Sequence, residues 1–297
     1  MTTNTVRTEP VTDAMTAPAT VKHRTRMQWD AAAAGWNAHG PKIRDWLRAP
    51  TDAMLAMAGI ADGQTVLDVA AGAGDQTLDI AARVGASGTV VATDISERIL
   101  SYALENAGRA GHANVHIHPA DAENLGLDSN VFDAAVCRLG LMFLPNPLVG
   151  LQQIHRVLKP GAHLCSIVFA GPEVNPCLRI LMSTAIRHAG VAPRDPFQPG
   201  GLVSLGKPGL MDALMQQAGF QSVATTRMDA PFRLPSTADY LTFLRESASP
   251  ILQILAPLDA DAKAAAWADI AMQLDAFQTD NDWIGPNTLL LTVGQKQ

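Results

Sequence analysis

The sequence predicts an α/β protein with a mostly parallel β-sheet. Three observations support this fold class. A short apolar run, Val66–Val69, ends in glycines and is followed at once by apolar residues at helical spacing. Short apolar segments and helical segments then alternate along the chain, and such alternation implies parallel strands joined by right-handed crossovers. The first strand is apolar on both faces, which predicts a sheet covered by helices on each side.

The turn after the first strand has the composition of a nucleotide-type pocket. Gly72 and Gly74 carry no Cβ atom, so the backbone can turn and a ligand can approach closely. A helix over Asp75–Ala82 begins at this turn, and a strand, a glycine turn and a helix N-terminus together form such a pocket. Thr77 occupies the position of the third glycine of a dinucleotide-binding G-x-G-x-x-G loop.

A carboxylate closes the second predicted strand, Gly88–Asp94. Asp94 follows the glycine loop by about 20 residues, a spacing at which an acid can accept hydrogen bonds from both ribose hydroxyls. The glycine loop by itself is weak evidence for a nucleotide. Paired with Asp94, it indicates a ligand that contains adenosine and leaves the rest of the ligand open.

The remaining elements continue the alternation. The core segments expected up to Gly171 are a helix over Ser96–Ala110, strands over Val115–His118 and Phe132–Leu139, a helix containing Leu151, Ile154 and Leu158, and a strand over His163–Phe169. The segments expected beyond it are helices over Asn175–His188 and Pro208–Ala218, a strand over Gln221–Met228, helices within Thr237–Phe277 and a strand over Thr288–Val293. A segment rich in Pro and Gly, Ala192–Gly206, predicts a mobile loop.

The N-terminal region divides into a tail and a helical cap. Residues 1–21 are rich in Thr, Ala and Pro, lack the apolar core of a secretory signal, and are expected to be disordered. Residues 22–62 carry apolar residues at helical spacing, including Trp29 and Trp36, and Thr51 is expected to cap a further helix. These helices either pack on the core as a plain cap or close over the bound ligand.

Composition argues against several classes of function. The net charge of −6 provides no attraction to nucleic-acid phosphates. No apolar stretch approaches the roughly 20 residues that a membrane span needs. Three cysteines without paired spacing indicate neither a disulfide framework nor a zinc site, so we expect no metal and a cytoplasmic protein. The hydrophobic fraction of 47% and the charged fraction of 17% are those of an ordinary globular protein.

Five motifs occur in a characteristic order: Val66–Gly74, Ala92–Asp94, Pro119–Glu123, Val131–Val136 and Val157–Gly161. In this order they resemble the class I S-adenosylmethionine-dependent methyltransferases, and among these the branch named for the ubiquinone/menaquinone C-methyltransferases. The resemblance is close over residues 63–169 and holds in outline elsewhere. It departs at Ala70, where the family has a glycine, and we expect a slightly different turn there.

The resemblance implies a Rossmann-like, seven-stranded, mostly parallel sheet with an antiparallel last strand. Residues 63–297 would form the methyltransferase domain, with helical lid insertions at about 172–206 and 232–284. Such insertions lie at the carboxyl ends of the strands, where open α/β sheets bind ligands. The N-terminal helices would roof the methionine end of the cofactor. The implied cofactor is S-adenosyl-L-methionine, and its product is S-adenosyl-L-homocysteine.

The resemblance also implies which residues hold the cofactor. Asp121 would accept a hydrogen bond from the adenine amino group, and the backbone of Ala122 would meet the neighbouring ring nitrogen. The end of the fourth strand, with Arg138, would lie beside the transferable methyl group. The full set of expected cofactor-binding residues is Ala70, Gly72, Gly74, Asp94, Ile95, Asp121, Ala122, Arg138 and Trp36.

Arg138 is the most informative residue of this set. A guanidinium at the end of a buried strand needs a partner, and either a structural carboxylate or an acidic or phenolate group of the substrate would serve. Cys137 beside it is expected to be a small core residue. The candidate substrate-binding residues are His39, Arg138, Met142 and Trp29.

The implied reaction is an in-line displacement in which the acceptor attacks the sulfonium methyl group. We expect a small aromatic or quinone-like hydrophobic acceptor, and alignment supplies much of the acceleration. Any general base remains unassigned, with His39, His118 and His188 as unranked candidates. The acceptor atom (C, O, N or S) and the choice between monomer and homodimer also stay open.

Two other classes of function share part of the pattern. A catalytically silent adenosyl-binding protein would have the same cofactor motifs and differ in a blocked pocket on the methyl side. A nicotinamide-dependent oxidoreductase would share the glycine loop and Asp94. It would leave the signals at Asp121 and Val157–Gly161 unexplained.

Overall fold

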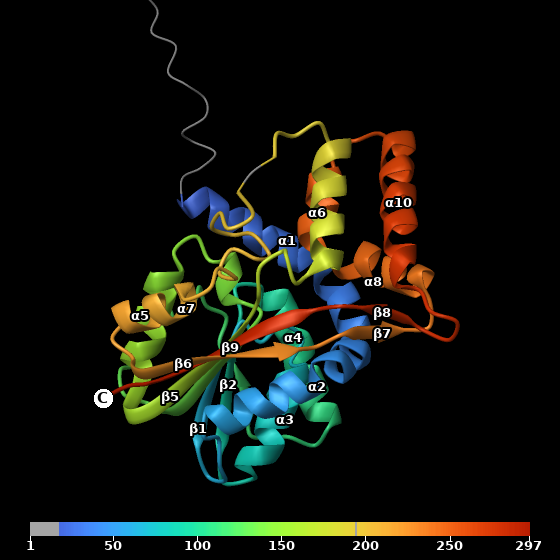
Figure 1. The fold of residues 1–297 in the computed structure, drawn as a ribbon. Coiled ribbons are helices and arrows are strands. Elements are labelled where there is room, and N and C mark those ends of the chain that lie inside the picture. Colours follow the sequence, from blue (N-terminus) through green and yellow to red (C-terminus); the bar gives the residue numbers. More distant parts are fainter. Residues whose placement is uncertain (1–17, 194) are drawn as a thin grey trace, which may run out of the picture.

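A computed structural model describes residues 18–193 and 195–297 of the chain (Figure 1). Most of the predicted disordered tail, residues 1–17, lies outside the described residues. The first helix, α1, starts at Pro18, so residues 18–21 are helical where the sequence predicts the end of the tail.

The core is a seven-stranded sheet in which the strand order is β3-β2-β1-β4-β5-β9-β6 (Figure 1). Its strands are β1 (Thr65–Val69), β2 (Thr89–Thr93), β3 (Val115–Ile117), β4 (Phe132–Arg138), β5 (Leu158–Phe169), β6 (Gln221–Asp229) and β9 (Thr288–Gln295). Strand β9 is antiparallel to both β5 and β6, and the other neighbouring pairs are parallel. This topology confirms the predicted Rossmann-like sheet with an antiparallel last strand.

Helices pack on both faces of the sheet. The helices of the central unit are α3 (Asp75–Val84), α4 (Glu97–Arg109), α5 (Pro147–Val157) and α7 (Leu210–Gln217). Helices α3 and α4 contact each other on one face, and α5 contacts α7 on the other. Side-chain N-caps mark where several helices begin. At α4, the N-cap residue is Ser96, whose hydroxyl accepts a hydrogen bond from the Ile99 N–H at 3.1 Å.

The switch in strand order falls between β1 and β4, because the chain winds outward from β1 to β3 and then returns to β4 on the other side. Open α/β sheets bind ligands at the carboxyl ends of the strands beside such a switch. A short 3₁₀ helix, η1 (Leu141–Phe143), follows β4 at this point.

Further helices cover the carboxyl ends of the strands. They are α1 (Pro18–Ala38), α2 (Gly40–Met57), α6 (Pro176–His188), α8 (Thr237–Ser247), α9 (Ser249–Leu255), α10 (Ala260–Leu274) and the 3₁₀ helix η2 (Asp275–Phe277). Helix α1 contacts α8 and α9, and α6 contacts α9 and α10. Figure 1 shows α6 and α10 standing beside each other above the sheet.

Two features of this covering layer differ from the sequence-based expectation. Helix α2 is continuous through Pro50, so Thr51 lies inside it and does not cap a new helix. The helix continues because Leu47, Met54 and Leu55 are all buried in the core. Strands β7 (Phe232–Leu234) and β8 (Trp283–Gly285) form a second, two-stranded sheet, and three-residue strands are too short to show alternation in a sequence.

The predicted loop at Ala192–Gly206 contributes to the interior. Its C-terminal part is buried, and the Ser204 hydroxyl donates a hydrogen bond to the Met142 carbonyl at 2.8 Å. Leu202 reaches the large cavity described below. This contact connects the loop to the segment that follows β4.

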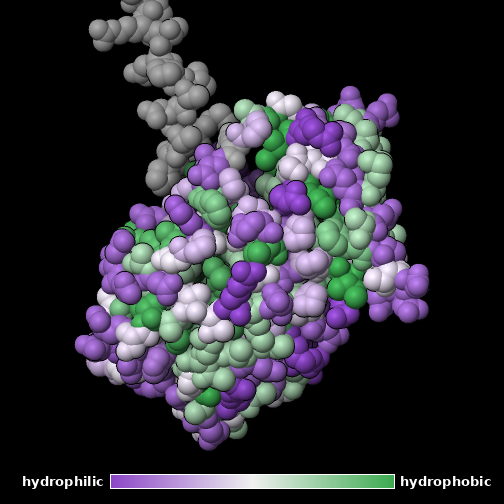
Figure 2. Space-filling view, in the orientation of Figure 1, coloured by the Kyte–Doolittle hydropathy of each residue, from purple (hydrophilic) through white to green (hydrophobic). Residues whose placement is uncertain are grey.

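Several large aromatic side chains of the segment predicted as a lid, residues 232–284, are buried. Trp283, Tyr240 and Phe232 expose 0%, 3% and 3% of their surface. On the molecular face shown in Figure 2, hydrophilic and hydrophobic residues are interspersed. Within residues 18–193 and 195–297, no helix is both long and apolar enough to cross a membrane.

Candidate active site

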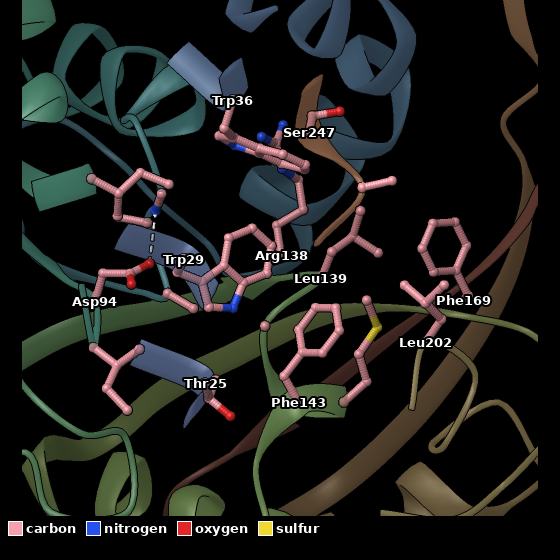
Figure 3. Close-up of a pocket in the computed structure, with 18 of the residues that line it drawn as sticks. Thr25, Trp29, Trp36, Asp94, Arg138, Leu139, Phe143, Phe169, Leu202 and Ser247 are labelled. Atoms are coloured by element: carbon pink, nitrogen blue, oxygen red, sulfur yellow. Dashed lines mark hydrogen bonds between the residues drawn. The ribbon is translucent and has the colours of Figure 1, made fainter. Parts of the chain in front are cut away.

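A large cavity lies over the carboxyl ends of β1, β2 and β4, beneath α1 and the lid helices. In Figure 3, Asp94 lies on one side of this cavity, Phe169 and Leu202 lie on the opposite side, and Trp29 and Leu139 lie between them. Of the predicted cofactor-binding residues, all except Gly74 line the cavity; of the predicted substrate-binding residues, all except His39 line it.

The glycine loop places its two glycines in different roles. Gly72 lines the cavity with φ of 59°, and a Cβ atom at this position would lie 3.2 Å from Trp36 Nε1. Gly74 has φ of 86° and caps α3. A Cβ atom there would lie 2.7 Å from the Cβ of Ala103 on α4. Gly74 therefore permits close packing of α3 against α4 and does not contact the cavity.

Ala70 adopts the left-handed backbone conformation that favours glycine, with φ of 55°. An alanine there costs on the order of 1 kcal/mol relative to a relaxed conformation. Gly140 provides the space for its methyl group, because a Cβ atom on Gly140 would lie 2.4 Å from the Ala70 Cβ. The turn therefore keeps a glycine-like conformation although the residue is alanine.

Asp94 is held in a fixed orientation. Its Oδ2 accepts a hydrogen bond from the Gly72 N–H at 3.1 Å (dashed in Figure 3), and its Oδ1 accepts one from the Ser96 N–H at 3.0 Å. Burial raises the pKa of Asp94 to about 6, against the opposing effect of these backbone hydrogen bonds. Each oxygen keeps a lone pair for a further donor such as a ribose hydroxyl.

The predicted adenine end carries an ion pair that the sequence does not reveal. Lys22 Nζ of α1 lies 2.7 Å from Asp121 Oδ2 and 2.7 Å from Glu123 Oε2. Asp121 Oδ1 also accepts a hydrogen bond from the Glu123 N–H at 2.9 Å. The start of α1 is therefore held over the segment that follows β3, beside Ile95 and Ala122 in the cavity lining.

Aromatic rings of α1 form the roof of the cavity. Trp29 packs edge-to-face against Trp36 at 5.6 Å and against Phe143 of η1 at 5.5 Å, measured between ring centroids. Met142 beside Phe143 is buried and lines the same space. Helices α1 and α2 pack on the core and also contribute residues to the cavity lining.

Arg138 has a structural carboxylate as its partner. Its Nη2 forms a buried ion pair with Asp75, the first residue of α3. Its Nη1 donates a hydrogen bond to the Thr51 hydroxyl of α2 at 2.8 Å. The guanidinium lines the cavity and is only 6% exposed in total, so its principal contacts are already made within the protein.

A second carboxylate, Asp68, lies under this network. It is fully buried and accepts hydrogen bonds of 2.7 Å from Gln76 Nε2 and from Thr77 Oγ1. Burial raises the pKa of Asp68 to about 7, and these hydrogen bonds and the charge of Arg138 oppose that rise. Thr77, which replaces the third glycine of a dinucleotide loop, therefore bonds to the strand β1 beneath it.

The histidines considered as bases lie elsewhere. His39 Nε2 is 2.6 Å from Glu246 Oε2, His118 Nε2 donates to the Leu125 carbonyl at 2.9 Å, and His188 Nε2 is 2.8 Å from Asp269 Oδ2. None of the three lines the cavity. His39 follows the end of α1, and its side chain packs edge-to-face against Phe243 at 5.2 Å instead of turning toward the cavity.

In the described part of the chain, no cluster of His, Cys, Asp and Glu could hold a metal ion.

Sequence reasoning missed several residues that line the cavity. Lys22, Asp75, Trp46, Phe169 and Tyr240 all contact it. Asp75 could have been suspected, because an acid in the first turn of a helix at a glycine loop stands close to the end of the neighbouring strand. The lid residues carry no such signal, since aromatic residues at helical spacing are equally typical of a core.

The sheet topology, the glycine loop and the acids after β2 and β3 are the features expected of an S-adenosylmethionine-dependent methyltransferase. A sequence model of the ubiE/COQ5 methyltransferase family matches residues 44–184. The ubiquinone/menaquinone biosynthesis C-methyltransferase UbiE of Escherichia coli K12 is 33% identical over 176 residues, which make up 56% of this chain and 69% of that protein. The chain belongs to the ubiE/COQ5 methyltransferase family.

Solved structures support the fold. The YcgJ protein of Bacillus subtilis superimposes with a TM-score of 0.57 at 16% identity, over 84% of this chain and 99% of that one. The phosphoethanolamine N-methyltransferase 2 of Haemonchus contortus, solved in complex with S-adenosyl-L-methionine, gives a TM-score of 0.53 at 18% identity over 88% of this chain and 57% of that one.

We predict that cofactor affinity falls as the pH drops through about 6. Protonation of Asp94, whose pKa burial raises to about 6, removes an acceptor for the ribose hydroxyls, so affinity for S-adenosylhomocysteine should fall by up to about tenfold per pH unit below that value. Asp94→Asn should bind about 10–100-fold more weakly at pH 8 and lose the pH dependence. Titration calorimetry from pH 5 to 8 measures both. An unchanged pH dependence in the variant would show that protonation of another group, such as Asp68, causes the loss of affinity.

We predict that Arg138→Met lowers both the stability of the protein and its cofactor affinity. Removal of the guanidinium leaves Asp75 buried without its counter-ion, which should cost about 3–5 kcal/mol of unfolding free energy. Urea denaturation measures this loss. Arg44→Met is the matched control, because the Arg44–Asp79 pair is partly exposed and should contribute about 0–1 kcal/mol. Unchanged stability and cofactor affinity, with reduced turnover, would instead assign Arg138 to the acceptor.

Proposed function

We propose that this methyltransferase transfers the methyl group of S-adenosylmethionine to a small, flat, hydrophobic acceptor of aromatic or quinone-like structure. The observation that carries this proposal is the aromatic lining of the cavity on the side away from Asp94. Trp46 stacks on Phe232 at 4.8 Å and on Phe169 at 6.2 Å between centroids, with interplanar angles of 28° and 23°. Rings in parallel planes provide a complementary surface for another flat ring.

Most of the rest of this half of the cavity is also apolar, and its polar residues are Tyr240, Ser247 and Asn287. Its other aliphatic lining residues are Leu47, Met142, Leu178, Leu181, Leu202, Leu244 and Ile251. Burial of apolar surface contributes roughly 25 cal/mol per Å², whereas a charged group placed here would lose its hydration without compensation. The name of the Escherichia coli relative, a ubiquinone/menaquinone biosynthesis C-methyltransferase, supports a quinone-related acceptor and transfer to carbon.

The polar half of the cavity suits the cofactor. Asp94 would hold the ribose hydroxyls, and Asp121 with the Ala122 backbone would hold the adenine ring. Arg138, Ala70 and Trp36 would surround the methionine end. When bound, S-adenosylmethionine supplies an electrophilic methyl group on a sulfonium sulfur. The residues of the chain would align the acceptor with that methyl group and exclude water, and such alignment supplies roughly 7–11 kcal/mol.

The described lining residues include no histidine. An electron-rich acceptor such as a hydroquinone or a phenol suits this lining. Methyl transfer to its carbon or oxygen releases one proton from the acceptor, which solvent water would take up. We assign no residue as the general base.

We also propose how the chain is organised. Residues 22–62 would act as a cap, and residues 63–297 as the methyltransferase domain with lid segments at about 172–206 and 232–284. The acceptor would be a small molecule in the cytoplasm. We expect a monomer or a homodimer.

We predict that S-adenosylhomocysteine raises the melting temperature of the protein in a concentration-dependent way, because a ligand that binds only the folded state stabilises it by mass action. At a ligand concentration about 100 times its Kd, the stabilisation is about 2.7 kcal/mol. NADH should produce no shift at the same concentrations. Differential scanning fluorimetry measures both, and stabilisation by NADH alone would contradict the assignment of the cofactor.

We predict that the purified protein transfers radiolabelled methyl groups from S-adenosylmethionine to members of a panel of hydroquinones and phenols, and not to aliphatic alcohols of equal size. Trp46→Ala should lower kcat/KM by more than about tenfold, or ~1.4 kcal/mol, while Trp46→Phe retains most of it.

Trp267→Ala is the matched control for this experiment, since Trp267 lies on α10 outside the cavity and contacts Arg245. Extraction into organic solvent followed by mass spectrometry identifies the methylated product. Transfer to the aliphatic compounds alone, or an equal loss in both tryptophan variants, would contradict the aromatic acceptor.

A further inference from the structure

The lid contributes a tyrosine whose hydroxyl has no partner. Tyr240 of α8 is 3% exposed and lines the cavity. Burial of a tyrosine normally gives its hydroxyl a hydrogen-bond partner. Here the hydroxyl forms no hydrogen bond with any of the described residues. Ser166 Oγ is the one fully enclosed side-chain polar atom without a partner in this part of the chain. The Tyr240 oxygen therefore keeps some accessible surface, on a residue that lines the cavity.

The ring of Tyr240 cannot easily turn away. It stacks on Trp283 at 4.2 Å with an interplanar angle of 22°, and it packs edge-to-face against Phe232 at 5.6 Å. Phe243 lies against it in a nearly parallel plane at 6.3 Å. A close-packed interior holds such a ring in one position, and therefore fixes the direction in which the hydroxyl can donate.

Ser247 is the other polar residue of the lid segments that reaches the cavity, and its Oγ donates to the Phe243 carbonyl at 2.5 Å. Asn287, which follows the lid, donates one of its two Nδ2 hydrogens to the Gly285 carbonyl at 3.2 Å. Arg138, at the boundary with the cofactor half, bonds to Asp75 and Thr51. Within residues 18–193 and 195–297, Tyr240 is thus the lid residue with a free donor at the cavity.

We propose that the Tyr240 hydroxyl donates a hydrogen bond to an oxygen of the methyl acceptor and thereby determines specificity for an aromatic ring that carries a carbonyl or hydroxyl group. This inference rests on the proposed function and deepens it. A site with a buried donor rejects an analogue that lacks the matching acceptor, because that donor is then left unpaired. Tyr240 orients the acceptor and is a positioning residue.

The protonation state of the hydroxyl agrees with this role. Burial raises the pKa of Tyr240 well above its ordinary value of 10, and the neighbouring Cys177 thiol acts in the same direction. Burial also raises the pKa of that thiol to about 12. Tyr240 therefore stays protonated at neutral pH and acts as a hydrogen-bond donor, never as the base for methyl transfer.

Two probes of equal shape test the inference: 1-naphthol and 1-methylnaphthalene. Their binding to the full chain saturated with S-adenosylhomocysteine is measured by tryptophan fluorescence quenching. A cavity without a free donor would favour 1-methylnaphthalene, because a buried hydroxyl without a partner loses its hydration. With Tyr240 as donor, we expect 1-naphthol to bind tighter than 1-methylnaphthalene by about tenfold.

Tyr240→Phe should abolish or reverse this preference. It should leave the affinity for 1-methylnaphthalene and S-adenosylhomocysteine within about twofold, and circular dichroism melting checks the fold. Tyr102→Phe is the matched control, since Tyr102 is the only other tyrosine of the chain and lies on α4 outside the cavity. It should retain the preference of the wild-type protein.

Each outcome has a separate meaning. Equal binding of both probes to the wild-type protein, or an unchanged preference for 1-naphthol in Tyr240→Phe, would overturn the role of Tyr240 while the aromatic acceptor stands. Binding of neither probe at millimolar concentration would overturn the aromatic acceptor itself, and the inference with it. The preference of the wild-type protein is informative even if the variant does not fold.

Discussion

The buried contacts of Arg138 join three parts of the chain that are distant in sequence. The guanidinium stands at the end of β4, its ion-pair partner Asp75 begins α3, and its hydrogen-bond partner Thr51 lies within α2. Each of these elements borders the cavity. A charge taken out of water needs its counter-ion in good geometry, so this one side chain constrains the relative positions of the glycine loop, the cap and the strand that ends nearest the acceptor half.

The backbone around this ion pair is held in an uncommon conformation. Ala70 after β1 and Leu139 after β4 both have positive φ, 55° and 57°, and both line the cavity. Such residues persist where the surrounding structure determines their conformation, and they concentrate at functional sites. The two strand ends meet at Gly140, where an added Cβ atom would collide with the Cβ of Ala70. The absence of a side chain at Gly140 therefore makes room for Ala70, which occupies a position where the family has a glycine.

Helix α1 connects the two halves of the cavity. Its first turns carry Lys22, which pairs with the acids after β3, and its later turns carry Trp29 and Trp36 above the strand ends. At its end, Gly35 packs so closely on α8 that a Cβ atom would lie 1.9 Å from the Glu246 carbonyl oxygen. One helix thus contacts the segment after β3, the strand ends at the centre of the cavity, and α8.

The sequence by itself predicted the alternation of strands and helices, the glycine turn after β1 and the acid after β2, and the family resemblance added the seven-stranded sheet and the remaining cofactor-binding residues. Those features depend on short segments in which neighbouring residues act together: an apolar strand, a glycine turn, and an acid at the next strand end. Eight of the nine residues expected to bind the cofactor, from these segments or from the resemblance, line the cavity. Gly74 does not, because contact with α4 rather than with a ligand requires a glycine there.

Only the tertiary structure decided the partner of Arg138, the pairing of Lys22 and the composition of the acceptor half. Trp46, Phe169, Phe232 and Tyr240 come from α2, β5, β7 and α8, and in the sequence each is one more apolar residue in an amphipathic segment. His39 shows the converse, because a polar residue of a suitable type turned toward Glu246 and away from the cavity. Local patterns specify which residues are buried, but the direction in which a buried side chain faces depends on packing between elements that are far apart in the chain.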